Sequence, residues 1–100
     1  MLTTIEIVHQ IQKSNQNCSK YRVAKLLGVS TGSLSKWTIS NGTMDDKIAL
    51  RAASILNIDP KYLVACVNAE RHKGKETYTV WKHICRTIED ENTRRETLKH

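Results

Sequence analysis

The spacing of apolar residues along the chain predicts a series of short amphipathic helices. The first apolar set recurs three or four residues apart: Ile5, Ile7, Val8 and Ile11. This is the period of one buried helix face. Thr3 and Glu6 fit a capping box at the start of that face, so a first helix should run from there to about residue 13. The polar run 14–17 then interrupts the pattern.

Two further predicted helices lie on either side of Gly28. Ser19 is a favourable N-cap, and the apolar side of the helix after it consists of Val23, Ala24, Leu26 and Leu27. Gly28 should end this helix in the left-handed conformation, which glycine adopts at the least cost. Ser30 should then cap a third helix over residues 31 to about 39.

The middle of the chain predicts two more helices. Thr43 and Asp46 fit a second capping box. The inward side of the helix that follows would carry Ile48, Ala49, Ala52, Ile55 and Leu56. Asp59 and Pro60 match an N-cap followed by proline at the first helical position. A fifth helix should therefore run from there to about residue 72.

The last apolar stripe predicts a sixth helix over about residues 76–88. Its members are Val80, Trp81, Ile84 and Ile88. Three interpretations of the stripe are open, because it can pack on the other helices, pair with a second copy, or bind another protein. Residues 89–100 contain a single apolar residue, Leu98, and we expect them to lack stable structure. The chain should thus be all-α, with one domain over residues 1–74 and a C-terminal helix and charged tail over 75–100.

The charge of the chain is uneven. Its formal net charge is +6 over 100 residues, and residues 1–43 alone carry five basic side chains against Glu6, a net of +4. A basic balance on a short chain favours a polyanionic partner, nucleic acid before a membrane surface. An ordinary solvated face is the plainer alternative. The concentration of charge around the second and third predicted helices favours nucleic acid.

The three cysteines indicate neither a disulfide framework nor a metal site. Cys18, Cys66 and Cys85 are odd in number and none is close to another in sequence, which fits reduced thiols in a cytosolic protein. The set Cys66, His72, His83 and Cys85 lacks the paired ligand spacing of zinc modules, so we expect no metal and no cofactor. The chain shows no apolar run long enough for a membrane span and no signal core. We therefore expect a cytoplasmic protein that does not bind membranes.

The segment around Gly28 matches the pattern of a helix-turn-helix. Ala24 is small where two helices would cross, Gly28 makes the turn, and Leu34 and Trp37 would anchor the second helix. This segment resembles the lambda-repressor-like class of phage and bacterial regulators, also called the Xre or Cro/C1 type. The resemblance covers roughly residues 3–70. One departure is that family members often place a glycine two or three residues after the position of Trp37, whereas here it comes later, at residue 42.

The resemblance implies a five-helix DNA-binding domain that acts as a homodimer on double-stranded DNA, as a transcriptional regulator and most often a repressor. It further implies that the third predicted helix reads the major groove. The residues that would touch DNA are Lys20, Thr31, Gly32, Ser33, Ser35, Lys36, Asn41 and Thr43. Lys20, Asn41 and Thr43 would contact phosphates. None of the eight offers bidentate Arg or Gln geometry, so the operator sequence cannot be read from them.

Two other functional classes compete with this interpretation. A protein-binding module on the same fold, such as an antitoxin or a phage inhibitor of a host protein, is the main alternative, because fold alone does not fix function. An enzyme is not expected. Residues 28–32 spell G-x-S-x-G, but a nucleophile elbow needs a preceding strand and a large sheet, and Ser30 is better explained as an N-cap.

Overall fold

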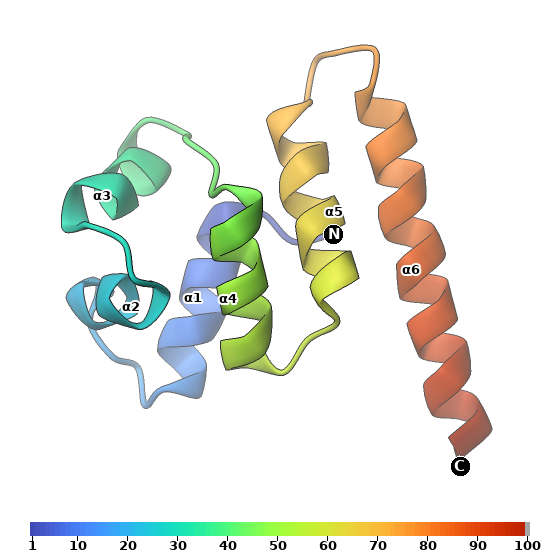
Figure 1. Cartoon of the computed structure of the whole chain (residues 1–100), viewed down its shortest axis with the longest axis horizontal. Helices are drawn as coiled ribbons and strands as arrows, with labels where there is room; N and C mark the ends of the chain where they lie inside the picture. Colours follow the sequence, from blue (N-terminus) through green and yellow to red (C-terminus); the bar gives the residue numbers. More distant parts are fainter. Residues whose placement is uncertain (100) are drawn as a thin grey trace.

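The computed structural model describes the backbone of residues 1–99 and the side chains of residues 1–97, and the regular structure in this part is entirely helical. The helices are α1 (Thr4–Ser14), α2 (Lys20–Leu27), α3 (Thr31–Ile39), α4 (Asp46–Leu56), α5 (Pro60–Arg71) and α6 (Tyr78–Lys99). The prediction of an all-α fold is therefore confirmed. Figure 1 shows α6 alongside α5 at one edge of the molecule, while α2 and α3 lie at the opposite edge.

One apolar core joins the first five helices. The side chains at its centre are fully or almost fully buried: Ile7, Val8, Ile11, Val23, Leu27, Leu34, Trp37, Met44, Ile48, Ala49, Ala52, Ala53, Leu63 and Val67. Each large aliphatic side chain buried in this way contributes about 1.5 to 3 kcal/mol. The predicted inward face of α4 packs against this core and includes one residue more, Ala53. Ile55 and Leu56 are only half-buried, whereas Ala53 is buried, because α4 turns its alanine-rich side toward its neighbours.

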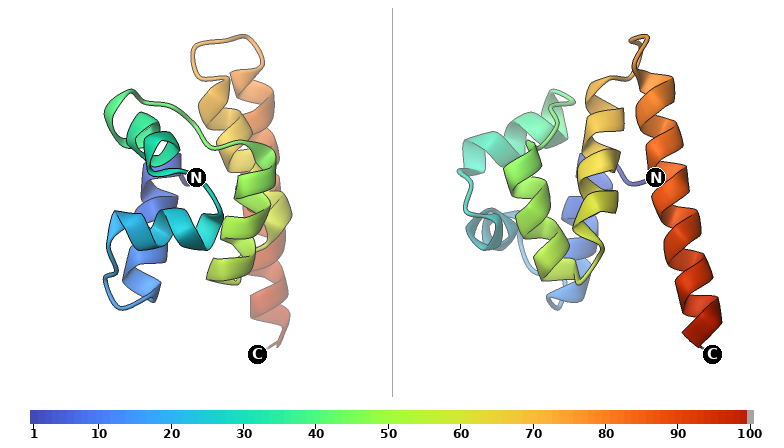
Figure 2. Two further views of the ribbon diagram at one scale, coloured as in Figure 1. Left: turned by 60° about the vertical axis from the view of Figure 1, so that its left-hand side comes forward. Right: turned by 45° about the vertical axis from the view of Figure 1, so that its right-hand side comes forward.

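The predicted helix starts are confirmed at four of the five N-caps. Thr3 and Glu6 form the capping box of α1, and the side chains of Ser19, Ser30 and Asp59 each accept a backbone N–H at the starts of α2, α3 and α5. Figure 2 shows that α1, α2 and α3 run in different directions.

The start of α4 differs from the prediction. Asp45 rather than Thr43 is the N-cap, and its Oδ1 accepts the N–H of Ile48 at 2.8 Å. Thr43 stays in the preceding loop because the residue between them, Met44, is fully buried. A carboxylate at this position also interacts favourably with the positive end of the helix dipole.

The expectation that residues 89–100 lack structure is wrong for residues 89–99. They continue α6 without a break to Lys99, and only residue 100 lies outside the described chain. The spacing Asp90 to Arg94 and Glu91 to Arg95 places opposite charges four residues apart, which stabilises an exposed helix. Asn92 also donates to Asp59 Oδ2 at 3.2 Å. This contact ties the second half of α6 to the start of α5.

A second, smaller apolar cluster joins α6 to α5. Cys66 and Cys85 are buried at its centre, and burial together with the neighbouring Cys66 raises the pKa of Cys85 to about 12. Three members of the predicted stripe, Trp81, Ile84 and Ile88, pack against this cluster. The fourth, Val80, is 58% exposed. Most of the stripe is therefore covered within one copy of the chain.

None of the helices from residue 1 to residue 99 combines the length and the apolar character that crossing a lipid bilayer requires.

Gly28 should be the least replaceable glycine of the chain. Its φ is +70°, and a Cβ there would collide with the Arg51 guanidinium, which donates to the Leu27 carbonyl at 2.9 Å. We expect Gly28→Ala to lower the free energy of unfolding by about 1 to 2 kcal/mol. Gly74→Ala is the matched control, because its φ is +85° but its Cβ would meet open space. Urea denaturation followed by circular dichroism should show the larger loss for Gly28→Ala, because Arg51 must move and give up its bond to the Leu27 carbonyl. Equal losses would mean that this displacement of Arg51 costs no stability.

Candidate nucleic-acid interface

The turn between α2 and α3 is fixed by hydrogen bonds at the end of α2. The N–H of Val29 donates to the Ala24 carbonyl at 3.0 Å, and the N–H of Gly28 donates to the Lys25 carbonyl at 3.2 Å. This is the Schellman arrangement that a left-handed glycine permits. Ala24 is buried. Because only Gly28, Val29 and Ser30 separate the two helices, α3 is held at a set angle to α2.

Helix α3 has one buried side and one exposed side. Leu34 and Trp37, three residues apart, are buried in the core, with Trp37 only 7% exposed. The exposed side of α3 carries Thr31, Gly32, Ser35, Lys36 and Ile39. The first four of these were expected to face DNA. The exposed side of α3 therefore carries two hydroxyl groups, the backbone of Gly32 and the Lys36 ammonium group. The opposite side of the helix is fixed in the core.

Ser33 is placed differently from the other predicted contacts on α3. It is half-buried, its N–H donates to Ser30 Oγ at 3.1 Å, and its hydroxyl accepts from Ser30 at 3.2 Å. Ser33 thus belongs to the capping arrangement at the start of α3. Ile39 is the residue that the sequence reasoning missed, and its spacing of four from Ser35 was the signal that could have placed it on the exposed side.

The surface of α2 and α3 is positively charged. Four exposed basic side chains lie on these helices, namely Lys20, Arg22, Lys25 and Lys36, and neither helix contains an acidic residue. Lys20 is the first residue of α2, at the helix end whose first N–H groups have no partner within the helix. Lys25 lies over the ring of Tyr21, with its Nζ 5.1 Å from the ring centroid. The resulting field attracts anions to this edge of the molecule.

The loop after α3 positions the last two predicted contact residues. Asn41 is exposed with a φ of +56°. The N–H of Gly42 donates to the Lys36 carbonyl at 3.1 Å, and a Cβ on Gly42 would lie only 3.3 Å from that oxygen. The late glycine therefore allows the loop to pass close beneath the end of α3.

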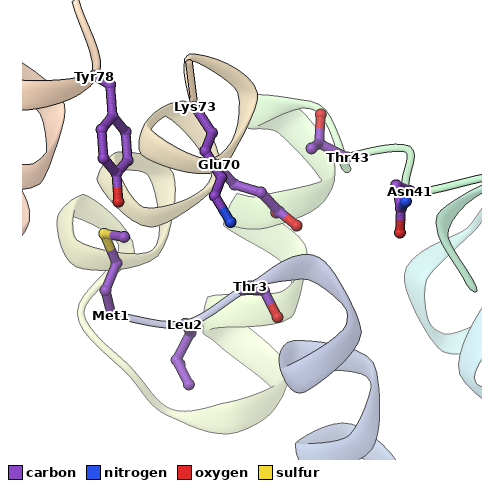
Figure 3. A pocket seen from close by; sticks show the side chains of 8 residues that line it. All are labelled: Met1, Leu2, Thr3, Asn41, Thr43, Glu70, Lys73 and Tyr78. Atoms are coloured by element: carbon purple, nitrogen blue, oxygen red, sulfur yellow. The ribbon is translucent and has the colours of Figure 1, made fainter. Parts of the chain in front are cut away.

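Asn41 and Thr43 also line a hollow of about 400 Å³ beside this loop (Figure 3). The other residues around it are Met1, Leu2, Thr3, Glu70, Lys73 and Tyr78. The hollow lies between the N-terminal segment and the ends of α5 and α6. Thr43 is half-buried there, so it is less accessible to a duplex than Asn41 is.

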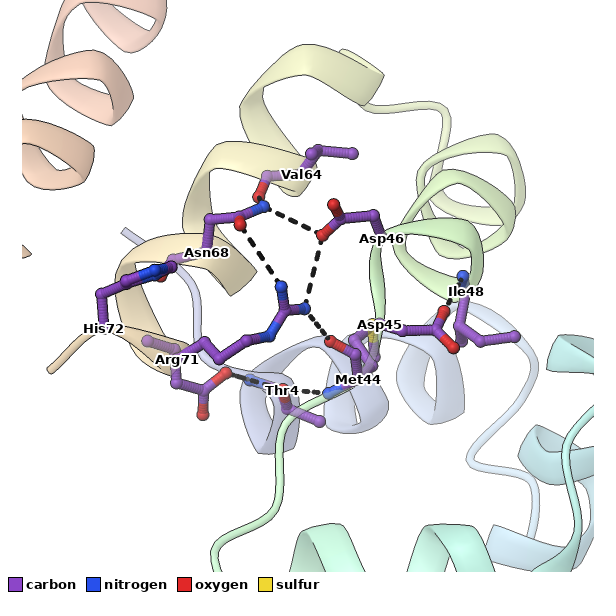
Figure 4. Close-up of polar contacts among 10 residues, drawn as sticks. Thr4, Met44, Asp45, Asp46, Ile48, Val64, Asn68, Arg71 and His72 are labelled. Carbon is purple, nitrogen blue, oxygen red and sulfur yellow. Dashed lines mark hydrogen bonds and ion pairs between the residues drawn. The ribbon is translucent and has the colours of Figure 1, made fainter. Parts of the chain in front are cut away.

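Side chains from α1 and α5 hold this loop in place (Figure 4). The Met44 N–H donates to Thr4 Oγ1 at 3.1 Å, and the Met44 carbonyl accepts from Arg71 at 2.8 Å. Glu70 Oε1 in turn accepts from the hydroxyl and the N–H of Thr4, at 2.6 and 2.9 Å. No sequence motif marked these residues, because the partners of Thr4 are 40 and 66 positions away.

Asp46 adds a second tie between α4 and α5. Its Oδ1 accepts from Asn68 at 2.9 Å and from Arg71 at 3.3 Å. The ion pair is largely exposed, so its own contribution to stability is small. Its role is to fix the direction in which the chain enters α4 after the loop.

The comparisons with known proteins found no match for this chain among protein-family models, curated proteins or solved structures. The function is therefore argued from the geometry and charge of the site.

Proposed function

We propose that this chain is a DNA-binding transcriptional regulator of the lambda-repressor-like helix-turn-helix class, with α3 as its recognition helix. The observation that carries the proposal is the two-sided character of α3. Leu34 and Trp37 fix it to the core, while Thr31, Ser35 and Lys36 remain exposed on its other side. A helix whose buried side is fixed in the core and whose exposed side carries these polar residues suits insertion into the major groove.

The dimensions and the charge support this proposal. The major groove is about 12 Å wide and admits one α-helix. Lys20 at the start of α2 would contact a phosphate, helped by the free N–H groups of that helix end. Lys36 would reach a guanine or a phosphate from α3. Asn41 would contact the next phosphate through its exposed side chain.

The exposed polar residues of α3 would contribute more to the affinity for a duplex than to discrimination between base sequences. Residues 31–36 contain no Arg, Asn or Gln, the side chains that read bases by paired hydrogen bonds. Small hydroxyls and one lysine discriminate weakly. Two copies on two half-sites would add selectivity, and occupation of a promoter by such a dimer would repress transcription.

Replacing Lys36 with alanine tests the proposal. We expect Lys36→Ala to weaken binding to DNA fragments from the gene's own neighbourhood about tenfold. The melting temperature should stay unchanged, because the side chain is exposed. Fluorescence anisotropy over a salt series should show steep salt dependence for the wild type and a slope smaller by about one for the variant.

The control is Arg86→Ala, which removes one exposed positive charge from α6, on the far side of the molecule from α3 (Figure 1). It should bind DNA nearly as the wild type does. If the wild type binds no DNA at low salt, the proposal is wrong. A stoichiometric protein partner that survives nuclease treatment would then favour a protein-binding module.

A further inference from the structure

Ile39 is the most exposed large apolar side chain in the described part of the protein. It is 79% exposed, whereas the others of this kind lie between 46% and 59%. These others are Met1, Tyr21, Leu50 and Val80. A single exposed apolar residue indicates nothing by itself. The position of Ile39 on α3 gives it significance.

Ile39 lies in line with the polar residues on the exposed side of α3. Thr31, Ser35 and Ile39 follow one another at intervals of four residues, so they form one row along the helix. The row spans about 12 Å from first to last. Lys36, three residues before Ile39, lies beside this row. Ile39 is therefore the apolar end of the row proposed to face DNA.

The loop after α3 leaves Ile39 uncovered. Asn41 turns the chain back with its positive φ, and the N–H of Gly42 bonds to the Lys36 carbonyl. A Cβ on Gly42 would lie 3.4 Å from Trp37 Cδ1, so the loop returns along the side of α3 that carries the buried Trp37. No other part of the described chain buries the isoleucine.

We propose that Ile39 contacts the 5-methyl group of a thymine in the major groove and is a specificity-determining residue. The inference rests on the proposed function and deepens it. Thymine is the base that presents a methyl group in that groove, and apolar side chains recognise it by contact. Ile39, at 79% exposure, offers a larger apolar surface than the single methyl group of Thr31. Ile39 would give the site a preference for thymine, which the hydroxyl groups and the single lysine do not provide.

The test compares thymine with uracil, which lacks only the methyl group. The wild-type chain first selects its preferred duplexes from a random 30-base-pair library, used here as the probe. Each thymine of the selected duplex is then replaced by deoxyuridine, one at a time. We expect one replacement per half-site to weaken wild-type binding roughly fourfold, the effect of one buried methyl-sized group.

The Ile39→Ala variant completes the comparison. It should bind the thymine duplex roughly fifteenfold more weakly than the wild type, because both copies of the dimer lose one methyl contact, and the deoxyuridine replacement should not weaken it further. Its melting temperature should be unchanged because the side chain is exposed. Leu50→Ala is the matched control, since it trims an exposed apolar residue of α4 and should bind both duplexes as the wild type does.

The outcomes separate this inference from the proposed function. If the library yields bound duplexes but no thymine position is sensitive to methyl removal, the inference about Ile39 is overturned and DNA binding stands. The same holds if Ile39→Ala stays as sensitive to deoxyuridine as the wild type. If no duplex is enriched or bound, the proposed function itself fails. If Ile39→Ala loses capture of a protein partner instead, Ile39 belongs to a protein interface.

Discussion

Replacing Trp37 with alanine should lower the free energy of unfolding by about 3 to 5 kcal/mol. The indole ring is 7% exposed and lies in the main core, so its loss leaves a cavity that the short helix α3 cannot close. A domain of this size has about 5 to 15 kcal/mol of total stability. The variant should therefore be close to unfolding at physiological temperature. Urea denaturation followed by far-ultraviolet circular dichroism measures the loss directly.

Trp81→Ala is the matched comparison for Trp37→Ala. Trp81 is half-buried at the contact between α5 and α6 and stacks on the His72 ring at a centroid distance of 5.9 Å. Trp81→Ala should lower the free energy of unfolding by less than Trp37→Ala does, because Trp81 buries less surface. If Trp37→Ala lowers the free energy of unfolding by less than about 1 kcal/mol, the side chain does not anchor α3. The proposal of a rigid recognition helix would then lose its structural support.

Local signals explain why the first three helices could be predicted to within a residue. An N-cap acts on backbone groups two or three positions away, so Thr3, Ser19 and Ser30 identify the helix starts without any knowledge of the fold. The glycine turn is equally local. These are also the features that place α3 on the surface, which is why its exposed polar residues could be predicted with it.

Tertiary contacts explain where the prediction of the fold was wrong. Thr43 and Asp45 both suit an N-cap, and the burial of Met44 between them decides for Asp45. The second half of α6 has no apolar stripe to signal it. Oppositely charged residues at helical spacing are a local signal for this helix, and the tertiary contact of Asn92 with Asp59 holds it against the start of α5.

The candidate site shows the same division between residues placed by local signals and residues placed by tertiary contacts. Thr31, Gly32, Ser35 and Lys36 follow from helical periodicity once Leu34 and Trp37 are taken as buried. Ile39 fits the same periodicity, four residues after Ser35, but an apolar residue near a helix end also suits the core by its chemistry. The observed exposure of its side chain decides that it belongs with the polar row. The loop that follows is likewise shaped by distant residues of α1 and α5.

Thr4→Val should be the most disruptive change that keeps the volume of a side chain. Thr4 is fully buried. Its hydroxyl donates to Glu70 at 2.6 Å and accepts the Met44 N–H at 3.1 Å. Valine fills the same space but leaves that buried N–H without an acceptor, and the carboxylate loses a short hydrogen bond. We expect the free energy of unfolding to fall by about 2 to 3 kcal/mol.

Thr4→Ser separates the hydrogen bonds from the packing. Serine keeps the hydroxyl and removes one buried methyl group, which should cost about 0.8 kcal/mol. If the network matters more than the methyl group, Thr4→Val is the less stable of the two in urea denaturation. The reverse order would contradict the network. Because Met44 lies in the loop that follows α3, Thr4→Val should also weaken DNA binding at temperatures where it is still folded, while Thr4→Ser should not.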